Sequence, residues 1–280
     1  MRSEVASVAR DWVDRVLSAV TLVEARQLYL GRVMVEAKSV EMLPNTRSFV
    51  VSAGLGYVSR TDLIPPYSLT ITSKDPDGIL NYLNGSNSPS TWWASLIGSF
   101  GQNKLALVDI MSSSQGIAVF ALPGSYLKMV AGEISNLPED YLNRVRIVGS
   151  PFEVIPGNLK RFWMPYDDRF DGVDSPNPGT LSDFAPRVGR HFIENILGSD
   201  PGLTPESHAT LVDDALMLMA PKEIPKRRPG TDQEIIALIK VLAKKNGMKS
   251  GETLRSLRRE IGWACEQSRF KRLFSIAMGR

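Results

Sequence analysis

The stretch that decides the fold reads SFVVSAGLGYVSRTDLIPPYSLTIT, from Ser48 to Thr72. Residues 49–51 form a short run of β-branched and aromatic side chains, which predicts a buried strand. The run ends in Ser52-Ala53-Gly54-Leu55-Gly56, small residues that allow a backbone to approach a neighbouring group closely. In an open α/β sheet, ligands bind beyond the carboxyl ends of the strands. We therefore expect these residues to border a ligand site.

The residues beyond this strand carry chemistry. Asp62 supplies a carboxylate and Tyr67 an aromatic hydroxyl, with the stiff Pro65-Pro66 pair between them. Tyr57 adds a second aromatic face. An alternative is that the glycines only form a turn and the prolines only end a strand.

Two further strands are predicted, each followed by small residues. Residues 116–122, GIAVFAL, run into Gly124-Ser125-Tyr126, and residues 145–148 run into Gly149-Ser150-Pro151-Phe152. Helical patterns separate the strands, which is typical of a parallel α/β sheet. We expect the three small-residue loops to meet at one rim of this sheet and to form the pocket.

Helical spacing of apolar residues predicts packing helices over residues 5–17, 22–41 and 90–100. The last of these contains the Trp92-Trp93 pair. Paired tryptophans are usually core residues, and we expect Trp93 to be the one available to line a pocket. Residues 103–114 fit a strand or a buried helix equally well.

Composition narrows the class of protein. The chain has 280 residues, 43% of them hydrophobic, with one cysteine and two histidines. A single cysteine excludes an internal disulfide, and two histidines give little support to zinc sites or to a histidine-activated nucleophile. We expect a cytoplasmic protein without a membrane span, a metal or another cofactor.

Positive charge is concentrated in the C-terminal fifth. Residues 222–280 carry a surplus of +9, whereas the first 221 residues carry a net −6. Residues 222–230 are rich in proline and charge and read as a linker between a domain at 1–221 and a module at 231–280. Three short helices in this module predict a helix-turn-helix-like bundle that binds double-stranded DNA, although such a bundle can also serve dimerisation or act as a lid. The expected DNA contacts are Arg258, Arg259, Arg269, Lys271 and Arg272.

Residues 52–67 resemble the LSAGYGL…PPYDLT signature of a bacterial family of domains of unknown function. That family is related to archaeosine synthase cores and, more distantly, to uracil-DNA glycosylases. The resemblance spans roughly residues 22–197, with further matches at 124–126 and 164–169. It implies a three-layer fold around a parallel sheet and a helix at residues 103–114.

The function implied by the resemblance is that of a phage-defence DNA glycosylase, which removes α-glucosyl-hydroxymethylcytosine from T-even phage DNA and leaves an abasic site. The sequence departs from the uracil-DNA glycosylase motifs in two places. The first motif, Gln-Asp-Pro-Tyr-His, is represented only by Asp62…Pro65-Pro66-Tyr67, and the histidine of the second motif is absent before Ser150-Pro151. Leaving-group stabilisation is therefore not carried over from the family.

Cleavage of an N-glycosidic bond develops positive charge on the sugar and negative charge on the departing base. Asp62 is the first candidate for the carboxylate and Asp168 the second, while Tyr67, Ser150 and the loop N–H groups are candidate donors to the base. A base must leave the helical stack to react, and Tyr57, Tyr67, Trp93 and Phe152 are candidates to stack on it. Two rival functions are a 7-deazaguanine-type modification of tRNA or DNA and a non-catalytic DNA-binding sensor.

Overall fold

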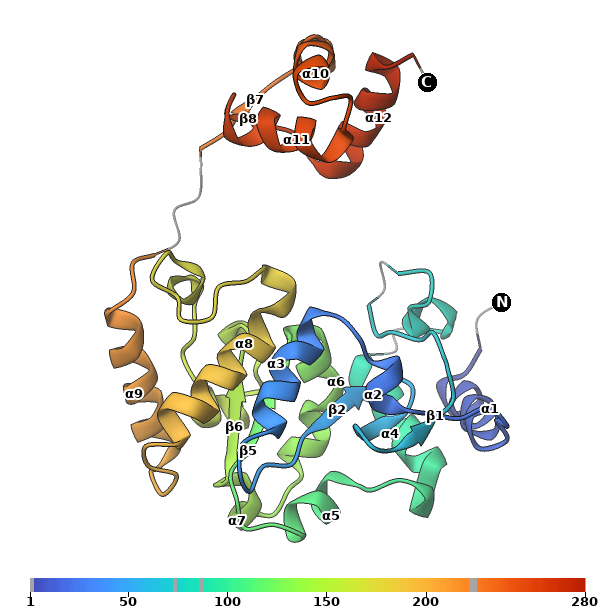
Figure 1. Cartoon of the computed structure of the whole chain (residues 1–280). Helices are drawn as coiled ribbons and strands as arrows, with labels where there is room; N and C mark the ends of the chain where they lie inside the picture. Colours follow the sequence, from blue (N-terminus) through green and yellow to red (C-terminus); the bar gives the residue numbers. More distant parts are fainter. Residues whose placement is uncertain (1–2, 73–74, 86–87, 222–225, 280) are drawn as a thin grey trace. The chain divides into compact units, whose positions relative to one another are not determined.

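The computed structural model describes residues 3–72, 75–85, 88–221 and 226–279. The chain divides into two compact units, residues 1–222 and residues 223–280 (Figure 1). Residues 222–225 of the predicted linker lie outside the described part. Each unit is treated by itself below.

A layer of helices supplies much of the first core. Helices α1 (Val5–Leu17) and α6 (Gly124–Ser135) both pack on α4 (Pro89–Phe100). Ser88 begins α4 by accepting a hydrogen bond from the Thr91 amide, as an N-cap residue does. Trp92 and Trp93 are both buried on this helix.

The strand predicted at residues 49–51 exists, but it belongs to a hairpin. β2 (Phe49–Ser52) pairs antiparallel with β3 (Gly56–Ser59), and Ser52 lies opposite Gly56. Gly56 has a φ of 73°, a conformation that glycine adopts without steric cost. The small residues 53–55 therefore make the hairpin turn.

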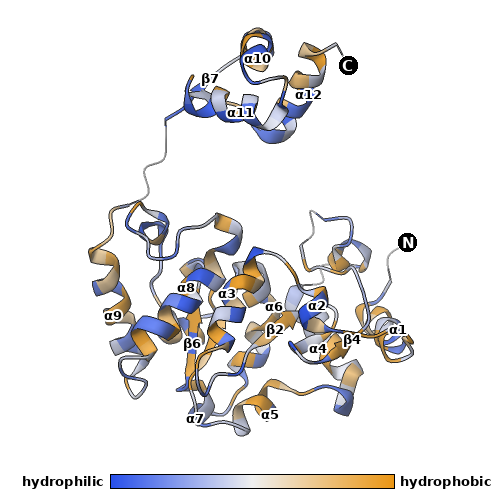
Figure 2. Cartoon of the chain, viewed as in Figure 1, coloured by the Kyte–Doolittle hydropathy of each residue, from blue (hydrophilic) through white to orange (hydrophobic). Residues whose placement is uncertain are grey.

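The parallel arrangement is limited to one pair of strands. β5 (Ala118–Ala121) pairs with β6 (Val145–Val148), and the crossover between them contains α6 and α7 (Glu139–Leu142). Helix α8 (Phe184–His191) lies so close to β5 that a Cβ on Gly189 would be 2.5 Å from the Ala121 Cβ. Figure 2 shows the hydrophobic colouring of β6.

The fold is therefore mixed α/β, as predicted, but the described strands form four two-stranded sheets. The expected three-stranded parallel sheet is not seen: β2 pairs with β3 and not with β5 or β6. Residues of β2 and β5 line one cavity, and the two strands belong to different sheets.

The helix predicted over residues 22–41 is wrong in its first half. Residues Val23–Glu24 form β1, which pairs with β4 (Leu63–Ile64), and a short helix α2 (Ala25–Leu28) follows. The helical conformation is interrupted at Gly31, whose φ is 100°, and α3 (Arg32–Glu41) begins after it. The helix expected within residues 103–114 is present as α5 (Leu107–Ser112).

The last part of the first unit forms a second apolar cluster. Phe170, Val188 and Phe192 pack there with Val212 and Leu216 of α9 (Pro205–Met217). Between α8 and α9 runs a π-helical segment, Phe192–Leu197. Such segments are rare and occur often at functional sites.

The second unit is a bundle of three helices, α10 (Asp232–Lys245), α11 (Ser250–Arg259) and α12 (Gln267–Ala277). A short parallel pair, β7 (Arg228–Pro229) and β8 (Trp263–Ala264), closes it. Its small core includes the buried Cys265. Across the described residues of both units, no helix combines the length and the apolar character needed to cross a bilayer.

Candidate functional site

A cavity of about 1200 Å³ lies in the first unit, between β2, β5, α3 and α8. Three of the residues that line it follow or end the predicted strands: Ser52 at the end of β2, Gly124 after β5 and Gly149 after β6. The small-residue loops that were expected to meet at one rim thus border one cavity.

Four tyrosines, Tyr29, Tyr57, Tyr67 and Tyr126, also line this cavity. The Tyr67 hydroxyl lies 2.7 Å from the Tyr29 hydroxyl and 2.5 Å from the Ser52 Oγ. Burial raises the pKa of Tyr67 and of Tyr29. Both phenols therefore stay protonated at neutral pH and act as hydrogen-bond donors.

The direction of these hydrogen bonds follows from the backbone. The Ser52 Oγ accepts from the Gly54 N–H at 3.2 Å and from the Leu55 N–H at 3.0 Å, which uses both of its lone pairs. The Ser52 proton is then donated to Tyr67, and the Tyr67 proton is available to Tyr29. The Tyr29 hydroxyl consequently keeps a proton that it can donate to a ligand in the cavity.

The structure distributes the predicted site residues unevenly. Those that line the cavity are Ser52, Tyr57, Tyr67 and Gly124. Those that are not part of its lining are Gly54, Gly56, Asp62, Trp93, Ser125, Ser150, Phe152 and Asp168.

The Asp62 side chain binds the backbone of a nearby turn. Its carboxylate accepts a hydrogen bond from the Ser59 amide at 3.0 Å and thereby holds the turn after β3. Burial is the main cause of the raised pKa of Tyr29, and the negative charge of Asp62 adds to it. Asp168 is exposed at the start of a short 3₁₀ segment, Asp168–Asp171.

Several other predicted site residues make structural contacts. The Trp93 indole donates to Glu133 Oε2 at 2.7 Å, and the Tyr57 hydroxyl donates to the same oxygen at 2.9 Å. The Ser150 hydroxyl donates to the Leu122 carbonyl at 2.6 Å, which joins the ends of β6 and β5.

The two glycines and Phe152 have packing roles. A Cβ on Gly54 would lie 3.1 Å from the rings of Trp12 and Tyr67, so its absence permits that contact. Gly56 provides the positive φ of the hairpin. Phe152 packs against Trp163, with ring centroids 5.0 Å apart, at the surface.

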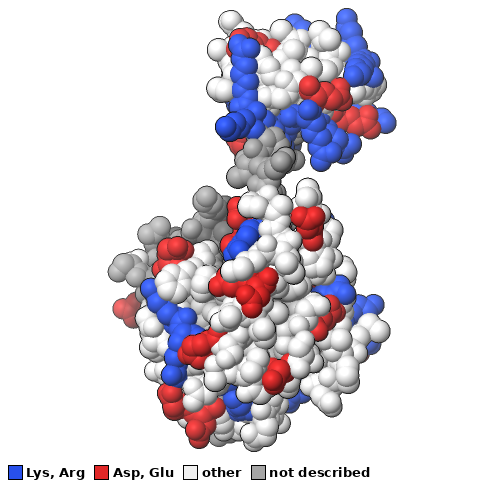
Figure 3. Space-filling model, turned by 90° about the vertical axis from the view of Figure 1, so that its left-hand side faces the viewer, with Lys and Arg blue, Asp and Glu red and all other residues white. Residues whose placement is uncertain are grey.

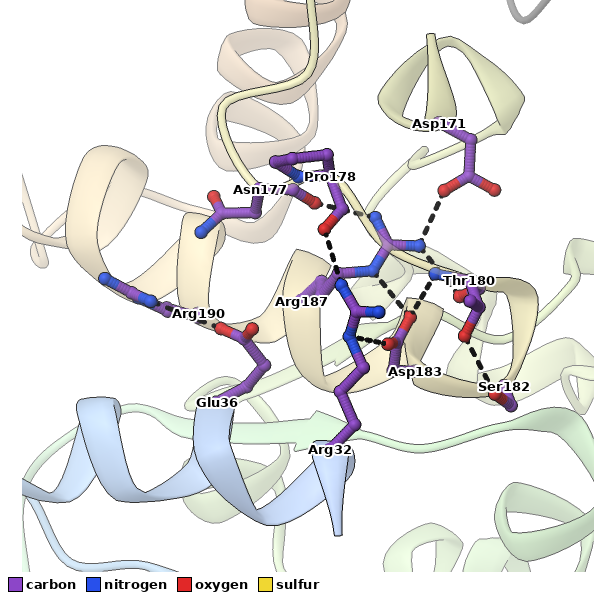
Figure 4. A network of polar contacts seen from close by, with 10 residues as sticks. All are labelled: Arg32, Glu36, Asp171, Asn177, Pro178, Thr180, Ser182, Asp183, Arg187 and Arg190. Carbon is purple, nitrogen blue, oxygen red and sulfur yellow. Dashed lines mark hydrogen bonds and ion pairs between the residues drawn. The ribbon is translucent and has the colours of Figure 1, made fainter.

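Helix α3 forms one wall of the cavity, although none of its residues is fully buried. Ion pairs attach it to the rest of the unit at three points: Arg32 to Asp183 at 2.7 Å, Glu36 to Arg190 at 3.3 Å, and Glu41 to Arg60 at 2.6 Å. Figure 4 shows the first two of these pairs between α3 and the α8 region. Three ion pairs therefore connect this wall to the rest of the unit.

The partner of Arg32 is itself fixed by a buried cation. Arg187 is completely buried and pairs with Asp183 at 2.9 Å and with Asp171 at 2.6 Å. It also donates to the carbonyls of Asn177 and Thr180, as Figure 4 shows. This network fixes the loop before α8 and positions Asp183 for α3.

The cavity is poor in acidic groups. Among the described residues of its lining, Glu194 is the one carboxylate, and it pairs with Arg190 at 2.9 Å. In the described parts of the chain, no group of three or more His, Cys, Asp or Glu side chains is arranged to hold a metal ion. The lining also includes four arginines, Arg47, Arg60, Arg144 and Arg190, besides the serine and tyrosine hydroxyls.

In the second unit, three of the five predicted DNA contacts have partners within the protein. Arg269 and Arg272 both bind Asp232, at 2.6 Å and 2.8 Å, and Arg258 donates to the Cys265 carbonyl at 2.7 Å. Arg259 and Lys271 are exposed. Figure 3 shows Lys and Arg over much of the visible face of this unit.

Comparison with known proteins adds no relative. A scan against protein-family models, a search of curated proteins and a search of solved structures each find no match.

Sequence reasoning placed Tyr126 on the predicted rim but did not select Tyr29 as a site residue. Tyr29 lies in the stretch predicted as one helix, and a Tyr-Leu-Gly sequence at residues 29–31 is the signal that could have marked the break. Tyr126 lies two residues after Gly124 in that rim loop.

Proposed function

We propose that this chain is a DNA glycosylase that hydrolyses the N-glycosidic bond of a modified cytosine and leaves an abasic site. The observation that carries the proposal is the cavity at the ends of β2, β5 and β6, with phenol and serine hydroxyls on its lining. An enzyme that acts on a base must receive it outside the stack, in a pocket with aromatic faces and hydrogen-bond donors. The resemblance of residues 52–67 to glycosylase-related domains agrees with this reading.

The proposed chemistry uses neutral donors on the departing base. Tyr29 and Tyr67 remain protonated because burial raises the pKa of each phenol. Tyr67 donates to Tyr29, so the Tyr29 hydroxyl can stabilise negative charge that develops on a base oxygen. Asp62 lies outside the cavity lining. Its charge would act through space on the positively charged sugar, while its hydrogen bond to Ser59 keeps the carboxylate in place.

The size of the cavity favours a large base over a small one. Its volume of about 1200 Å³ is above the usual range for small-ligand sites, roughly 300–1,000 Å³. A glucosylated hydroxymethylcytosine needs more room than uracil, and such a substrate would give the enzyme a role in defence against phages with modified DNA. The proposed setting is the cytoplasm, where phage DNA is replicated.

The direct test incubates the full chain with glucosylated phage DNA and with unmodified DNA of the same sequence. We expect free modified base and alkali-labile abasic sites from the modified DNA alone. Release of no base from either DNA would overturn the proposal. Incorporation of a 7-deazaguanine precursor into tRNA or DNA, measured alongside, would favour the modifying enzyme instead.

A second function, a non-catalytic sensor of modified DNA, is favoured by one observation. Among the described residues, neither of the predicted carboxylates, Asp62 or Asp168, lines the cavity. A sensor would bind modified DNA more tightly than unmodified DNA and release no base from it. Binding measured by fluorescence anisotropy, together with the base-release assay, separates the two functions.

A further inference from the structure

A second cavity, of about 480 Å³, lies at the amino ends of β5 and β6. It is bordered by residues 143–144 and Arg146 at the start of β6 and by the loop 201–204 before α9. Ser52, Gly124 and Gly149, which mark the strand ends in the first cavity, do not line it. It therefore calls for a separate explanation.

Arg146 is a buried cation that no described carboxylate contacts, although the negative charge of Glu206 acts on it through space. Arg146 is only 1% exposed. Among the described residues, no carboxylate oxygen lies within ion-pair distance of its guanidinium. Its guanidinium donates to His208 Nδ1 at 2.9 Å and to the carbonyls of Asn143, Val145 and Leu203 at 2.9, 2.7 and 2.9 Å. All four acceptors are neutral, because His208 accepts at Nδ1 and uses Nε2 to donate to the Asp200 carbonyl.

The charge on Arg146 remains at neutral pH. Burial lowers its pKa to about 10, which still leaves the guanidinium protonated. A buried charge is costly unless an opposite charge accompanies it. Four of the five guanidinium N–H groups are used in the contacts above, which leaves one Nη2 hydrogen for a further acceptor.

Two more arginines line the same cavity. Arg144 donates to the carbonyls of Met111 and Gly116 and so also binds neutral groups. Arg161 pairs with Glu139, which lies outside the lining. Against these three cations, Glu206 is the one carboxylate among the described lining residues.

The start of α9 does not contribute to this argument. Pro205 has no N–H, and the Ser207 amide is already bonded to the Thr204 Oγ1 at 3.2 Å. The excess positive charge comes from side chains, and arginine side chains match the oxygens of phosphate well.

We propose that this second cavity binds a phosphate group, either as inorganic phosphate or as the phosphate of a small monoester such as a nucleotide. The proposal does not rest on the glycosylase function, since it needs none of the groups at the ends of β2, β5 and β6, although Ile117, Arg144 and Pro201 line both cavities. Its ligand would balance Arg146 and Arg144.

The test measures thermal unfolding and titration calorimetry of the full chain with sodium phosphate, AMP and adenosine. Sodium chloride at the same ionic strength is the reference. We expect saturable binding of phosphate and a higher unfolding temperature than in chloride. Tighter binding of AMP than of phosphate, with no binding of adenosine, would identify a monoester as the ligand, and equal binding would identify free phosphate. No saturable binding of either anion would overturn the proposal.

Two exposed lining residues provide variants with opposite expected effects. Arg161→Gln should weaken phosphate binding by about fivefold and Glu206→Gln should tighten it by a similar factor, since each change alters one charge at the cavity. Arg26→Gln is the matched control, because Arg26 is an exposed arginine in an ion pair with Glu24 away from this cavity. Equal affinities for phosphate in all three variants would contradict the assignment. It would also be contradicted if this site bound duplex DNA but not phosphate.

Discussion

Tyr67 joins two polar groups of the candidate site through one hydroxyl. The bonds to Ser52 Oγ and Tyr29 are 2.5 and 2.7 Å long. Tyr67→Phe should reduce the free energy of unfolding by about 1 kcal/mol, as expected for loss of a partly buried hydrogen bond. If the hydroxyls also serve the reaction, base release should fall much further than this stability change can explain.

Urea unfolding and base-release assays on the same preparation would measure both effects of Tyr67→Phe. Tyr82→Phe is a suitable control, because the Tyr82 hydroxyl also forms one hydrogen bond, to the Pro76 carbonyl, but lies outside the cavity. Base release at the wild-type rate in Tyr67→Phe would show that the hydroxyl has a structural role alone.

Asp62 carries two properties that substitution can separate. Its oxygen accepts from the Ser59 amide, and its charge reaches Tyr29. Asp62→Asn keeps an acceptor and removes the charge, whereas Asp62→Ala removes both. If the charge supports catalysis, both variants should lose base release, and only Asp62→Ala should also lose stability, by about 1 kcal/mol.

DNA binding is the control for the two Asp62 variants, and both should retain it. Full base release by Asp62→Asn would remove this carboxylate from the mechanism. The turn contact to Ser59 would then account for the residue.

His208 makes the stability of the first unit depend on pH. Burial lowers the pKa of its imidazole below the ordinary 6.5. The unfolded chain then binds the proton more readily than the folded chain, so stability is complete above about pH 6.5 and decreases as the pH falls below it. Protonation would also remove the acceptor that Arg146 uses at Nδ1.

The expected result is a lower unfolding temperature at pH 5.5 than at pH 7.5, with a smaller difference in His208→Gln. His191 is the other histidine, and burial lowers its pKa as well, so His191→Gln is the companion variant. An acid-induced decrease that stays the same size in both variants would contradict this explanation.

Among the secondary-structure elements, those with strong local patterns agree with the sequence. The parallel strands β5 and β6 are short, apolar and bounded by glycine or proline, and α10 starts at Thr231 with a complete capping box. Each of these signals consists of residues only a few positions apart in the sequence. Pattern reasoning reads such signals well.

Which strands pair depends on residues far apart in the sequence, and local patterns did not predict the partner of β2. The residues that end β2 are equally suited to a rim loop and to a hairpin turn, and only the packing of Tyr67 and Trp12 around Gly54 shows which is formed. The part of the candidate site formed by Ser52, Tyr57, Tyr67 and Gly124 was predictable for the same reason that the strands were. Tyr29 was not, because its position depends on the break at Gly31.

The helices of the second unit allow two kinds of arginine to be distinguished. Arg269 bonds Asp232 and the Gly230 carbonyl, which ties α12 to the start of α10. Arg259 and Lys271 are both exposed. Arg259→Gln with Lys271→Gln should therefore weaken DNA binding and leave the unfolding temperature unchanged, whereas Arg269→Gln should lower that temperature.

The salt dependence of DNA affinity quantifies this prediction. Each phosphate contact that is lost should reduce the slope of log affinity against log salt by about 0.9. The slope should thus fall by up to about 2 in the double variant. Lys240→Gln, another exposed cation on α10, serves as a control for the general loss of charge. An unchanged slope in the double variant would place the DNA contacts elsewhere.

For the molecule as a whole, the separation into two compact units permits a truncation experiment. Deletion of residues 225–280 removes the whole positive surplus of +9 that lies after residue 221. The remaining chain should bind any DNA more weakly and with a smaller salt slope, because it releases fewer counterions. It should still prefer the same modified base at low salt if the first cavity selects that base.

Binding and base release, measured across a salt series for the full and shortened chains, test this division of roles. Circular dichroism of the shortened chain provides the control for folding. Loss of base preference would place part of the recognition in the second unit, and an unchanged salt slope would show that this unit does not hold the DNA.

Cys265 gives the second unit a reporter of its own. It is the single cysteine of the chain, it lies buried in the bundle, and burial raises the pKa of its thiol. A thiol reagent can therefore modify the protein only when this bundle opens, whatever the first unit does. The rate of labelling in the native protein measures the opening equilibrium of the bundle alone, without mutation or an added dye, and any DNA that binds there should slow it.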